Sequence, residues 1–299
     1  MKVKSFPSKV LLFGEYSVIK HSNALAMAYP LFMGHLTFTS SEGRKDPELK
    51  ALSSYLNQLD EREELPFEFD LASFDFDVGQ GLIFESSIPQ GYGVGSSGAL
   101  CAAIYDRYVK NPNKWNTPIE TLKKHFCLME SHFHGSSSGL DPLVSFLGKP
   151  IVKNKETGFR VTELPEMTTK GATLFLLNTG RSRKTEPLVN LFLEKCKNED
   201  FSNLCENVLS PLTDECISSF LSGDVDKLWD TFGELSQFQL EHFSPMIPTL
   251  YRDLWQQGLD DKGFYLKLCG AGGGGFLMGM TKDFKKCSRI LKDFEIRAL

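Results

Sequence analysis

The segment at 89–98, Pro-Gln-Gly-Tyr-Gly-Val-Gly-Ser-Ser-Gly, constrains the fold of this chain more than any other stretch. Three glycines stand at alternate positions, two serines follow them, and an apolar run comes next at 99–104. Glycine lets backbone N–H groups point into one concavity, and a helix N-terminus adds partial positive charge. We therefore predict a loop that runs into a helix and binds phosphate through Gly91, Gly93, Gly95, Ser96, Ser97 and Gly98.

Two further segments carry the same kind of signal. Residues 7–16 run from Pro-Ser-Lys into Gly-Glu-Tyr, and residues 267–275 read Lys-Leu-Cys-Gly-Ala-Gly-Gly-Gly-Gly. A single glycine-rich loop is usually only a turn. A second one in the same chain favours a shared role in binding phosphate, to which the C-terminal loop would contribute Gly270, Ala271, Gly272 and Gly273.

Two familiar phosphate motifs do not explain the central segment. Residues 93–98 satisfy G-x-G-x-x-G, with an expected strand before them at 82–88 and a helix after them. A dinucleotide-binding unit also needs a second strand that ends in an acidic residue roughly 20 positions on, but residues 115–120 resemble a helix start with a Thr117-x-x-Glu120 capping box. The chain also lacks G-x-x-x-x-G-K-[ST]. A nicotinamide-dependent oxidoreductase is therefore a remote alternative.

Length and composition describe a mildly acidic protein of two domains. The chain has 299 residues, which exceeds one usual hydrophobic core. Its 33 basic and 38 acidic residues give a net charge of −5 without a basic cluster, which argues against a nucleic-acid binder. No run approaches 18 apolar residues, so we expect no membrane span. Seven cysteines without a C-x-x-C pair predict reduced thiols, and the N-terminus lacks a signal-peptide core, so we expect a cytoplasmic protein.

Hydrophobic periodicity predicts a mixture of strands and helices. We expect helices over 46–65, with a leucine stripe on one face, and over 98–108 and 119–134. The strands are expected at 10–13 and 18–19 as a hairpin around 14–16, at 31–40, at 67–77 from alternating aromatic and acidic residues, in a hairpin over 150–161, and at 172–177, 264–268 and 276–280.

Taken together, the three glycine-bearing segments resemble the motifs of the GHMP small-molecule kinases. They are Pro-x-Lys-Val-x-Leu-x-Gly-Glu-Tyr, Pro-x-Gly-x-Gly-x-Gly-Ser-Ser and Gly-Ala-Gly-Gly-Gly-Gly, they occur in the family's order, and they span 7–275. Within that family, the segments at 130–141 and 178–185 are most similar to mevalonate kinases. The resemblance implies an α+β fold, with a nucleotide-binding domain like ribosomal protein S5 domain 2 at 1–165, a ferredoxin-like domain at 166–299, and the active site between them.

The resemblance also implies ATP-dependent transfer of the γ-phosphoryl group to an alcohol, with Mg²⁺ as cofactor. It places the metal on Ser97 and Glu130, and it makes Asp141 the base that accepts the substrate's hydroxyl proton. Lys9 is the expected partner of Asp141, because an ammonium group keeps a neighbouring carboxylate ionised. Without the resemblance, Glu130 would be assigned to a solvated helix face and Asp141 to a helix cap.

The acceptor follows from the same comparison. A mevalonate carboxylate needs a fork of donors, and Arg183 with Thr185 matches the mevalonate kinase pattern, while Glu15 matches an acidic residue near the substrate hydroxyls. Tyr16 stands where mevalonate kinases have histidine, and Gly-Glu-Tyr is closer to bacterial phosphomevalonate kinases. Gly98 replaces the family's alanine.

We therefore expect conversion of mevalonate to 5-phosphomevalonate in isoprenoid precursor synthesis, with phosphomevalonate kinase or another GHMP kinase as the alternative. A phosphate-bearing acceptor would need further cations, for which the candidates are Lys20, Arg181 and Lys184. The family includes monomers and homodimers, and the sequence does not choose between them.

Overall fold

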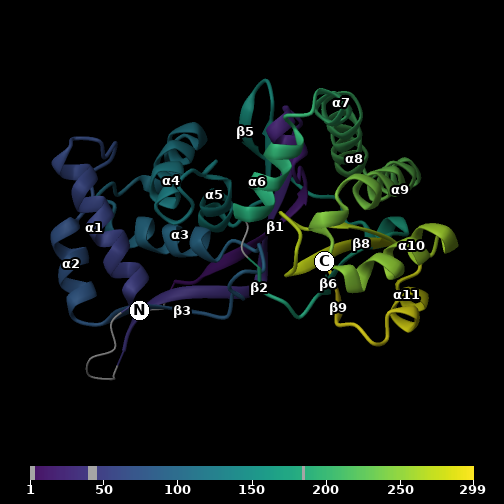
Figure 1. Ribbon diagram of the computed structural model, residues 1–299. Coiled ribbons are helices and arrows are strands. Elements are labelled where there is room, and N and C mark those ends of the chain that lie inside the picture. Colours follow the sequence, from purple (N-terminus) through teal and green to yellow (C-terminus); the bar gives the residue numbers. More distant parts are fainter. Residues whose placement is uncertain (1–3, 40–45, 184–185) are drawn as a thin grey trace. The chain divides into compact units, whose positions relative to one another are not determined.

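The computed structural model describes residues 4–39, 46–183 and 186–299 (Figure 1). The chain forms two compact units, each built from separate segments. The first unit contains the chain up to Lys9, Met27–Pro89 and Gly95–Ile151; the second contains Val10–Ala26, Gln90–Val94 and Val152–Leu299. The last change of unit follows Ile151, and the domain division between 165 and 166 stays a prediction.

One five-stranded sheet has the order β1-β2-β4-β5, with β3 paired to β2. Its strands are β1 (Phe6–Phe13), β2 (Ala24–Phe38), β3 (Leu82–Ser86), β4 (Ile151–Asn154) and β5 (Gly158–Val161). The pairing of β2 with β3 is antiparallel, in a register that places Gly34 opposite Ser86 and Phe38 opposite Leu82. The predicted strand at 82–88 and hairpin over 150–161 are confirmed.

The helices of the first unit are α1 (Pro47–Glu61), α2 (Leu71–Gly79), α3 (Ser96–Tyr108), α4 (Ile119–His134) and α5 (Leu140–Leu147), with a short 3-10 turn at Lys114–Asn116. Asp46 caps α1 by accepting hydrogen bonds from the backbone N–H groups of Glu48 and Leu49. The predicted leucine stripe of α1 is buried at Leu49, Leu52, Leu56 and Leu59. The predictions of α1, α3 and α4 are therefore confirmed.

Three local predictions in the first half of the chain are wrong. The expected strand at 67–77 is largely α2, because Asp70 caps a helix there and side chains then follow helical spacing: Phe74 is buried and Phe76 is 66% exposed. The expected strand at 18–19 is a 3-10 turn at Ser17–Lys20. The predicted capping box needs Thr117 at the N-cap position, but α4 begins one residue later and its N-cap is Pro118. Proline has neither a side-chain oxygen to cap the helix nor an N–H group to donate to a glutamate.

The second unit contains a four-stranded antiparallel sheet with the order β7-β8-β6-β9. The strands are β6 (Thr173–Asn178), β7 (Tyr265–Leu268), β8 (Phe276–Thr281) and β9 (Ile296–Ala298). Helices lie between the first and second of these strands in the chain and between the third and fourth, which gives a β-α-β-β-α-β sequence. This connectivity agrees with the ferredoxin-like fold that was predicted.

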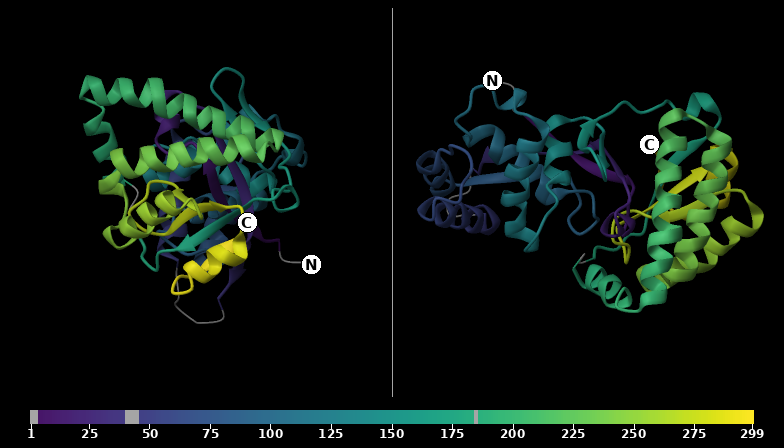
Figure 2. Two further views of the ribbon diagram at one scale, coloured as in Figure 1. Left: turned by 90° about the vertical axis from the view of Figure 1, so that its right-hand side faces the viewer. Right: turned by 90° about the horizontal axis from the view of Figure 1, so that it is seen from above.

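The helices of the second unit pack around that sheet. They are α6 (Glu186–Lys195), α7 (Glu199–Leu204), a π-helical turn at Cys205–Leu209, α8 (Ser210–Ser222), α9 (Val225–His242), α10 (Arg252–Asp261) and α11 (Phe284–Ile290), with 3-10 turns at Thr168–Lys170, Ser244–Met246 and Thr249–Tyr251. The long helices α8 and α9 lie side by side, and α9 and α10 contact β7 (Figure 2).

Two expectations from composition can be compared with this structure. All seven cysteines are free thiols, as predicted. Within the described ranges, no helix has the length and apolar character needed to cross a bilayer.

Candidate active site

In the first unit, Lys9 and Asp141 form an ion pair. Lys9 lies on β1 and Asp141 in the first turn of α5, and the distance from Lys9 Nζ to Asp141 Oδ1 is 3.0 Å. The Lys9 side chain is 8% exposed and that of Asp141 is 29% exposed, so the carboxylate is the member that solvent or a ligand can reach. The N-cap position of α5 is occupied by Gly139, so Asp141 does not act as the helix cap. The structure therefore brings together the predicted base and its predicted partner.

The end of the central glycine segment packs directly on this pair. Gly95 has a φ of +77°, and a Cβ built on it would lie 2.8 Å from Lys9 Cγ. A Cβ built on Gly98 would lie 2.8 Å from the backbone carbon of Asp141 and the nitrogen of Pro142. Contacts this short exclude a side chain unless the neighbours move. The glycine at 98, where the family has alanine, thus lets the start of α3 approach the start of α5.

The predicted metal ligands also meet in the first unit. Ser97 Oγ donates a hydrogen bond to Glu130 Oε1 at 3.2 Å, and Ser137 Oγ donates one to Glu130 Oε2. His134 Nε2 lies 3.0 Å from Ser97 Oγ. Burial raises the pKa of the Glu130 carboxyl to about 8, and the nearby charge of Asp141 adds to this shift, while Ser137, Lys9 and Ser97 oppose it.

This donor set fits magnesium. Mg²⁺ prefers hard oxygen ligands and is usually held by one or two carboxylates together with substrate phosphates and water. Glu130 and Ser97 supply a carboxylate and a hydroxyl oxygen, and a divalent cation would offset the repulsion between the charges of Glu130 and Asp141. Across the ranges that the structure covers, no three His, Cys, Asp or Glu side chains gather as a complete protein-only metal site.

In the second unit, Glu15 and Lys267 form a buried ion pair. The distance from Lys267 Nζ to Glu15 Oε1 is 2.6 Å, and the two side chains are 0% and 1% exposed, respectively. Glu15 follows β1 in the first motif, and Lys267 lies on β7 just before the C-terminal glycine segment. Burial raises the pKa of the Glu15 carboxyl, and the Lys267 ammonium opposes that shift. Contact between Glu15 and a substrate hydroxyl stays a prediction.

Tyr16 is also buried, and its backbone is strained. It has a φ of +61°, a region that non-glycine residues rarely adopt. Its hydroxyl donates a hydrogen bond to the backbone oxygen of Ala271 at 2.6 Å, and its ring packs against Phe192 and Phe243. Burial raises the pKa of the Tyr16 phenol. The side chain therefore holds the C-terminal glycine segment at Ala271.

Arg183 lies against two glycine segments of the second unit. Its backbone N–H donates to Gly91 O at 2.9 Å. A Cβ built on Gly93 would lie 2.5 Å from Arg183 Nη2, and one built on Gly270 would lie 3.0 Å from the same atom. Burial lowers the pKa of the Arg183 guanidinium. The Arg183 guanidinium therefore lies in the space that the missing side chains of Gly93 and Gly270 leave open. Thr185, which was predicted to act with Arg183, falls outside the described residues.

The C-terminal glycine segment contacts the residues around Arg183 and Tyr16. The N–H of Gly275 donates to Arg181 O at 2.6 Å, its carbonyl accepts from Thr179, and a Cβ built on it would lie 2.4 Å from Tyr92 O. A Cβ on Gly272 would lie 2.4 Å from Met246 O. Among the predicted residues of this loop, Gly270 and Gly273 face Arg183, and Ala271 accepts from Tyr16.

The sequence analysis assigned no role to Lys267, Ser137 or His134. A signal for Lys267 was present, because a lysine in an otherwise apolar strand needs a buried acid as partner. Ser137 and His134 lie in the segment similar to mevalonate kinases, but their contacts depend on how the loop after α4 folds back.

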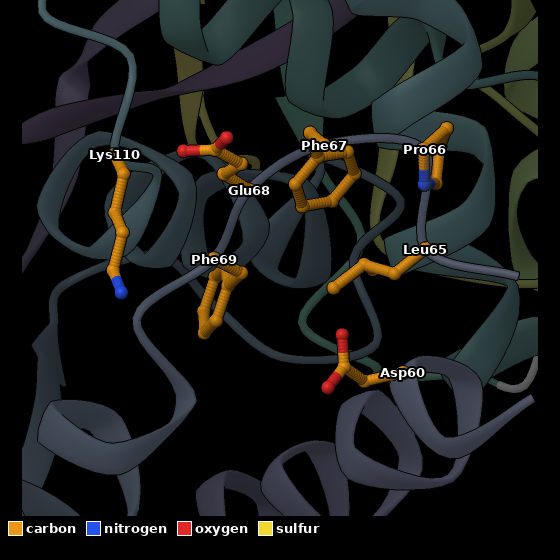
Figure 3. Close-up of a pocket in the computed structure, with 7 residues that line it drawn as sticks. All are labelled: Asp60, Leu65, Pro66, Phe67, Glu68, Phe69 and Lys110. Atoms are coloured by element: carbon orange, nitrogen blue, oxygen red, sulfur yellow. The ribbon is translucent and has the colours of Figure 1, made fainter. Parts of the chain in front are cut away.

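One pocket lies apart from this site, and one sequence alternative can be compared with the structure. Figure 3 shows a pocket of about 570 Å³ in the first unit that contains no predicted site residue; its walls are Asp60, Leu65, Pro66, Phe67, Glu68, Phe69 and Lys110. The segment that a dinucleotide-binding unit would need as its second strand is the turn at Lys114–Asn116 and the helix α4. This removes the support for a nicotinamide-dependent enzyme.

Comparison with known families agrees with the motifs. Residues 52–149 match the family described as GHMP kinases N terminal domain. The mevalonate kinase of Dictyostelium discoideum is 22% identical over an alignment of 346 positions, which covers 93% of this chain and 87% of that protein.

Solved structures show the same fold. The mevalonate kinase of L. major in complex with R-mevalonate superimposes with a TM-score of 0.64 at 17% identity, over 98% of this chain and 90% of that one. The phosphomevalonate kinase of Streptococcus pneumoniae, in complex with phosphomevalonate and AMPPNP, gives a TM-score of 0.67 at 14% identity, over 100% of both chains. The resemblance to the GHMP kinases and the predicted α+β fold are confirmed, and these comparisons support a kinase.

Proposed function

Starting from its resemblance to the GHMP kinases, we propose that this chain transfers the γ-phosphoryl group of ATP to the primary alcohol of mevalonate, forming 5-phosphomevalonate for isoprenoid precursor synthesis. The observation that carries the proposal is the ion pair of Lys9 and Asp141 at the end of the serine-bearing glycine segment. Phosphoryl transfer to an alcohol needs a positioned base beside a phosphate site, and these residues supply both.

The protein's part in the reaction is to hold the reactants in line and to move one proton. Asp141 accepts the proton of the attacking hydroxyl, and the Lys9 ammonium, 3.0 Å away, holds the carboxylate in position and favours the developing alkoxide. Alignment of donor and acceptor provides much of the remaining acceleration, because the transition state is loose and needs little covalent chemistry.

ATP is bound by the backbone around the central glycine segment and the N-terminus of α3, where unpaired N–H groups attract phosphate. Ser97 and Glu130 would hold Mg²⁺, whose charge neutralises phosphate oxygens when it is bound. The hydrogen bonds of Ser97 and Ser137 to Glu130 hold the carboxylate in one orientation for that role.

The acceptor is proposed to be mevalonate because of Arg183. A guanidinium can bind a carboxylate through two hydrogen bonds, and the guanidinium of Arg183 lies among glycines whose missing side chains make room for it. Phosphomevalonate is the second candidate, favoured by Tyr16 in the first motif. Of the cations considered for its phosphate, Lys20 already binds Glu206 at 2.9 Å and Ser202 at 2.6 Å, and Lys184 falls outside the described residues.

A coupled ADP-release assay tests the proposal directly. Mevalonate, phosphomevalonate, homoserine and galactose are each supplied with ATP, with and without Mg²⁺. The proposal expects turnover with mevalonate that requires Mg²⁺. Turnover with phosphomevalonate alone would transfer the assignment to the second candidate, and activity with neither would overturn both.

A further inference from the structure

The pair of Glu15 and Lys267 joins two motifs that are 252 residues apart in the chain. Both side chains are removed from solvent, with exposures of 1% and 0%. Burying two charges is costly unless their geometry is good and their remaining polar groups are satisfied. Because both side chains are buried, the pair does not contribute to the charged surface of the protein, so its role concerns the residues around it.

The hydrogen bonds of the pair are made within the protein. Lys267 Nζ donates to Glu15 Oε1 and to the backbone oxygen of Leu268, both at 2.6 Å. The backbone N–H groups of Glu15 and Gly270 also lower the pKa of the Glu15 carboxyl. With these donors in place and 1% of the side chain exposed, Glu15 offers little surface to an acceptor molecule.

The residues around Glu15 contact the C-terminal glycine segment, and that segment lies beside Arg183. Tyr16, the residue after Glu15, donates to Ala271 O, and a Cβ built on the neighbouring Gly270 would lie 3.0 Å from Arg183 Nη2. Gly273 lies near the aliphatic part of Arg183, since a Cβ built on it would lie 3.5 Å from Arg183 Cδ. All these residues belong to the second unit.

We propose that Glu15 and Lys267 are positioning residues: their ion pair fixes the glycine segment at 270–275, and that segment holds Arg183 in the orientation that binds the acceptor's carboxylate. Glu15 then acts behind the loop and does not contact the acceptor. The acceptor part of this inference rests on the proposed function, whereas the effect on the glycine segment does not.

The test compares single and double replacements. Glu15→Gln or Lys267→Met alone leaves one buried charge without its partner, so each should lower the Tm clearly. Replacing both residues removes both charges, and the Tm should return most of the way to that of the wild type. The Asp226→Asn/Lys282→Met variant is the matched control, because it removes an exposed ion pair of the same unit, with a distance of 2.7 Å.

Hydrogen exchange in the free protein tests the loop itself. In the Glu15→Gln/Lys267→Met variant, amides at 269–276 should exchange at least about tenfold faster than in the wild type. Loss of the ion pair lowers the free energy needed to open this segment locally. The control variant should match the wild type there. Unchanged exchange at 269–276 in the double variant would overturn the proposal, whatever the enzyme's substrate proves to be.

Binding of R-mevalonate, measured by calorimetry, tests the route through Arg183. The double variant should bind mevalonate about tenfold more weakly, as expected when a charge-assisted hydrogen bond is misaligned. In an Arg183→Ala background the same double replacement should cause no further loss. A further loss of similar size would show that Glu15 contacts the acceptor itself, and would overturn the proposal.

The two hypotheses fail in different ways. If the wild type binds no mevalonate, the proposed function fails, and exchange at 269–276 still decides whether the pair holds the loop. If mevalonate is phosphorylated normally and the double variant keeps the wild-type affinity, the proposed function stands and the positioning role is wrong.

Discussion

Gly98 lies directly against Asp141: a Cβ built on the glycine would be 2.9 Å from the Cβ of the aspartate. This contact joins the start of α3, where the serines lie, to the proposed base at the start of α5. The spacing between the proposed phosphate site and the proposed base is thus set by a residue that has no side chain.

Gly98→Ala should therefore impair catalysis more than stability. Alanine improves helix propensity by about 1 kcal/mol, which offsets part of an overpacking cost of about 1–3 kcal/mol. Displacement of Asp141 should lower kcat by about tenfold or more, because small shifts of a catalytic group are costly. Steady-state kinetics and urea unfolding measure the two effects.

The control for this variant is Gly79→Ala, since a Cβ at Gly79 would have no atom within 4 Å. It should leave kcat unchanged. A Gly98→Ala enzyme with the wild-type kcat would contradict the assigned contact between α3 and α5.

Replacing Arg183 by lysine keeps the charge and removes the fork of donors. We expect the KM for mevalonate to rise about tenfold while kcat changes little, since binding of a non-reacting carboxylate contributes equally to ground state and transition state. Kinetics at saturating ATP and Mg²⁺ measure this, with the exposed Arg289→Lys as control. A large fall in kcat at an unchanged KM would place Arg183 at the reacting phosphoryl group instead.

His125 predicts a pH dependence of stability. Its Nδ1 lies 2.8 Å from the hydroxyl of Tyr105, and burial lowers its pKa. The unfolded chain takes up a proton near the ordinary histidine pKa of about 6.5, whereas the folded protein takes it up only at lower pH. The stability from neutral His125 is therefore complete above about pH 6.5 and falls as the pH drops below it.

Urea unfolding at pH 7.5 and 5.5 tests this prediction. The fall in unfolding free energy between the two values should be smaller in His125→Gln than in the wild type. Burial also lowers the pKa of His132 on the same helix, so part of the fall should remain. Equal falls in variant and wild type would rule out His125 as a source.

The sequence predicted three helices, α1, α3 and α4, and most of the strands, because their signals are local. The span of α4, Ile119–His134, was predicted to the residue from its hydrophobic periodicity. The prediction for the segment at 67–77 was wrong because its alternating phenylalanines fit the pattern of a strand. The segment instead forms most of a helix that Asp70 caps and that buries Phe74, and this burial depends on the neighbouring helices.

The site was predictable to the extent that each motif carries its own chemistry. Lys9 and Ser97 stand in the glycine-bearing motifs, whereas Glu130 and Asp141 were assigned through the family resemblance. The structure places the four residues in contacting pairs. Lys267 was missed as a partner of Glu15 because no local pattern links residues 252 positions apart. Likewise, the burial of Tyr16 follows only from packing in the folded unit.

The central claim is that Asp141, paired with Lys9, deprotonates an alcohol beside a phosphate site. Mevalonate-dependent ADP formation by the wild type and by Asp141→Asn, with Mg²⁺ and ATP saturating and ATP-analogue affinity measured alongside, tests it most directly. The account predicts that kcat falls by about 10²-fold or more in the variant while affinity for the analogue is retained. Near wild-type turnover by Asp141→Asn would contradict it.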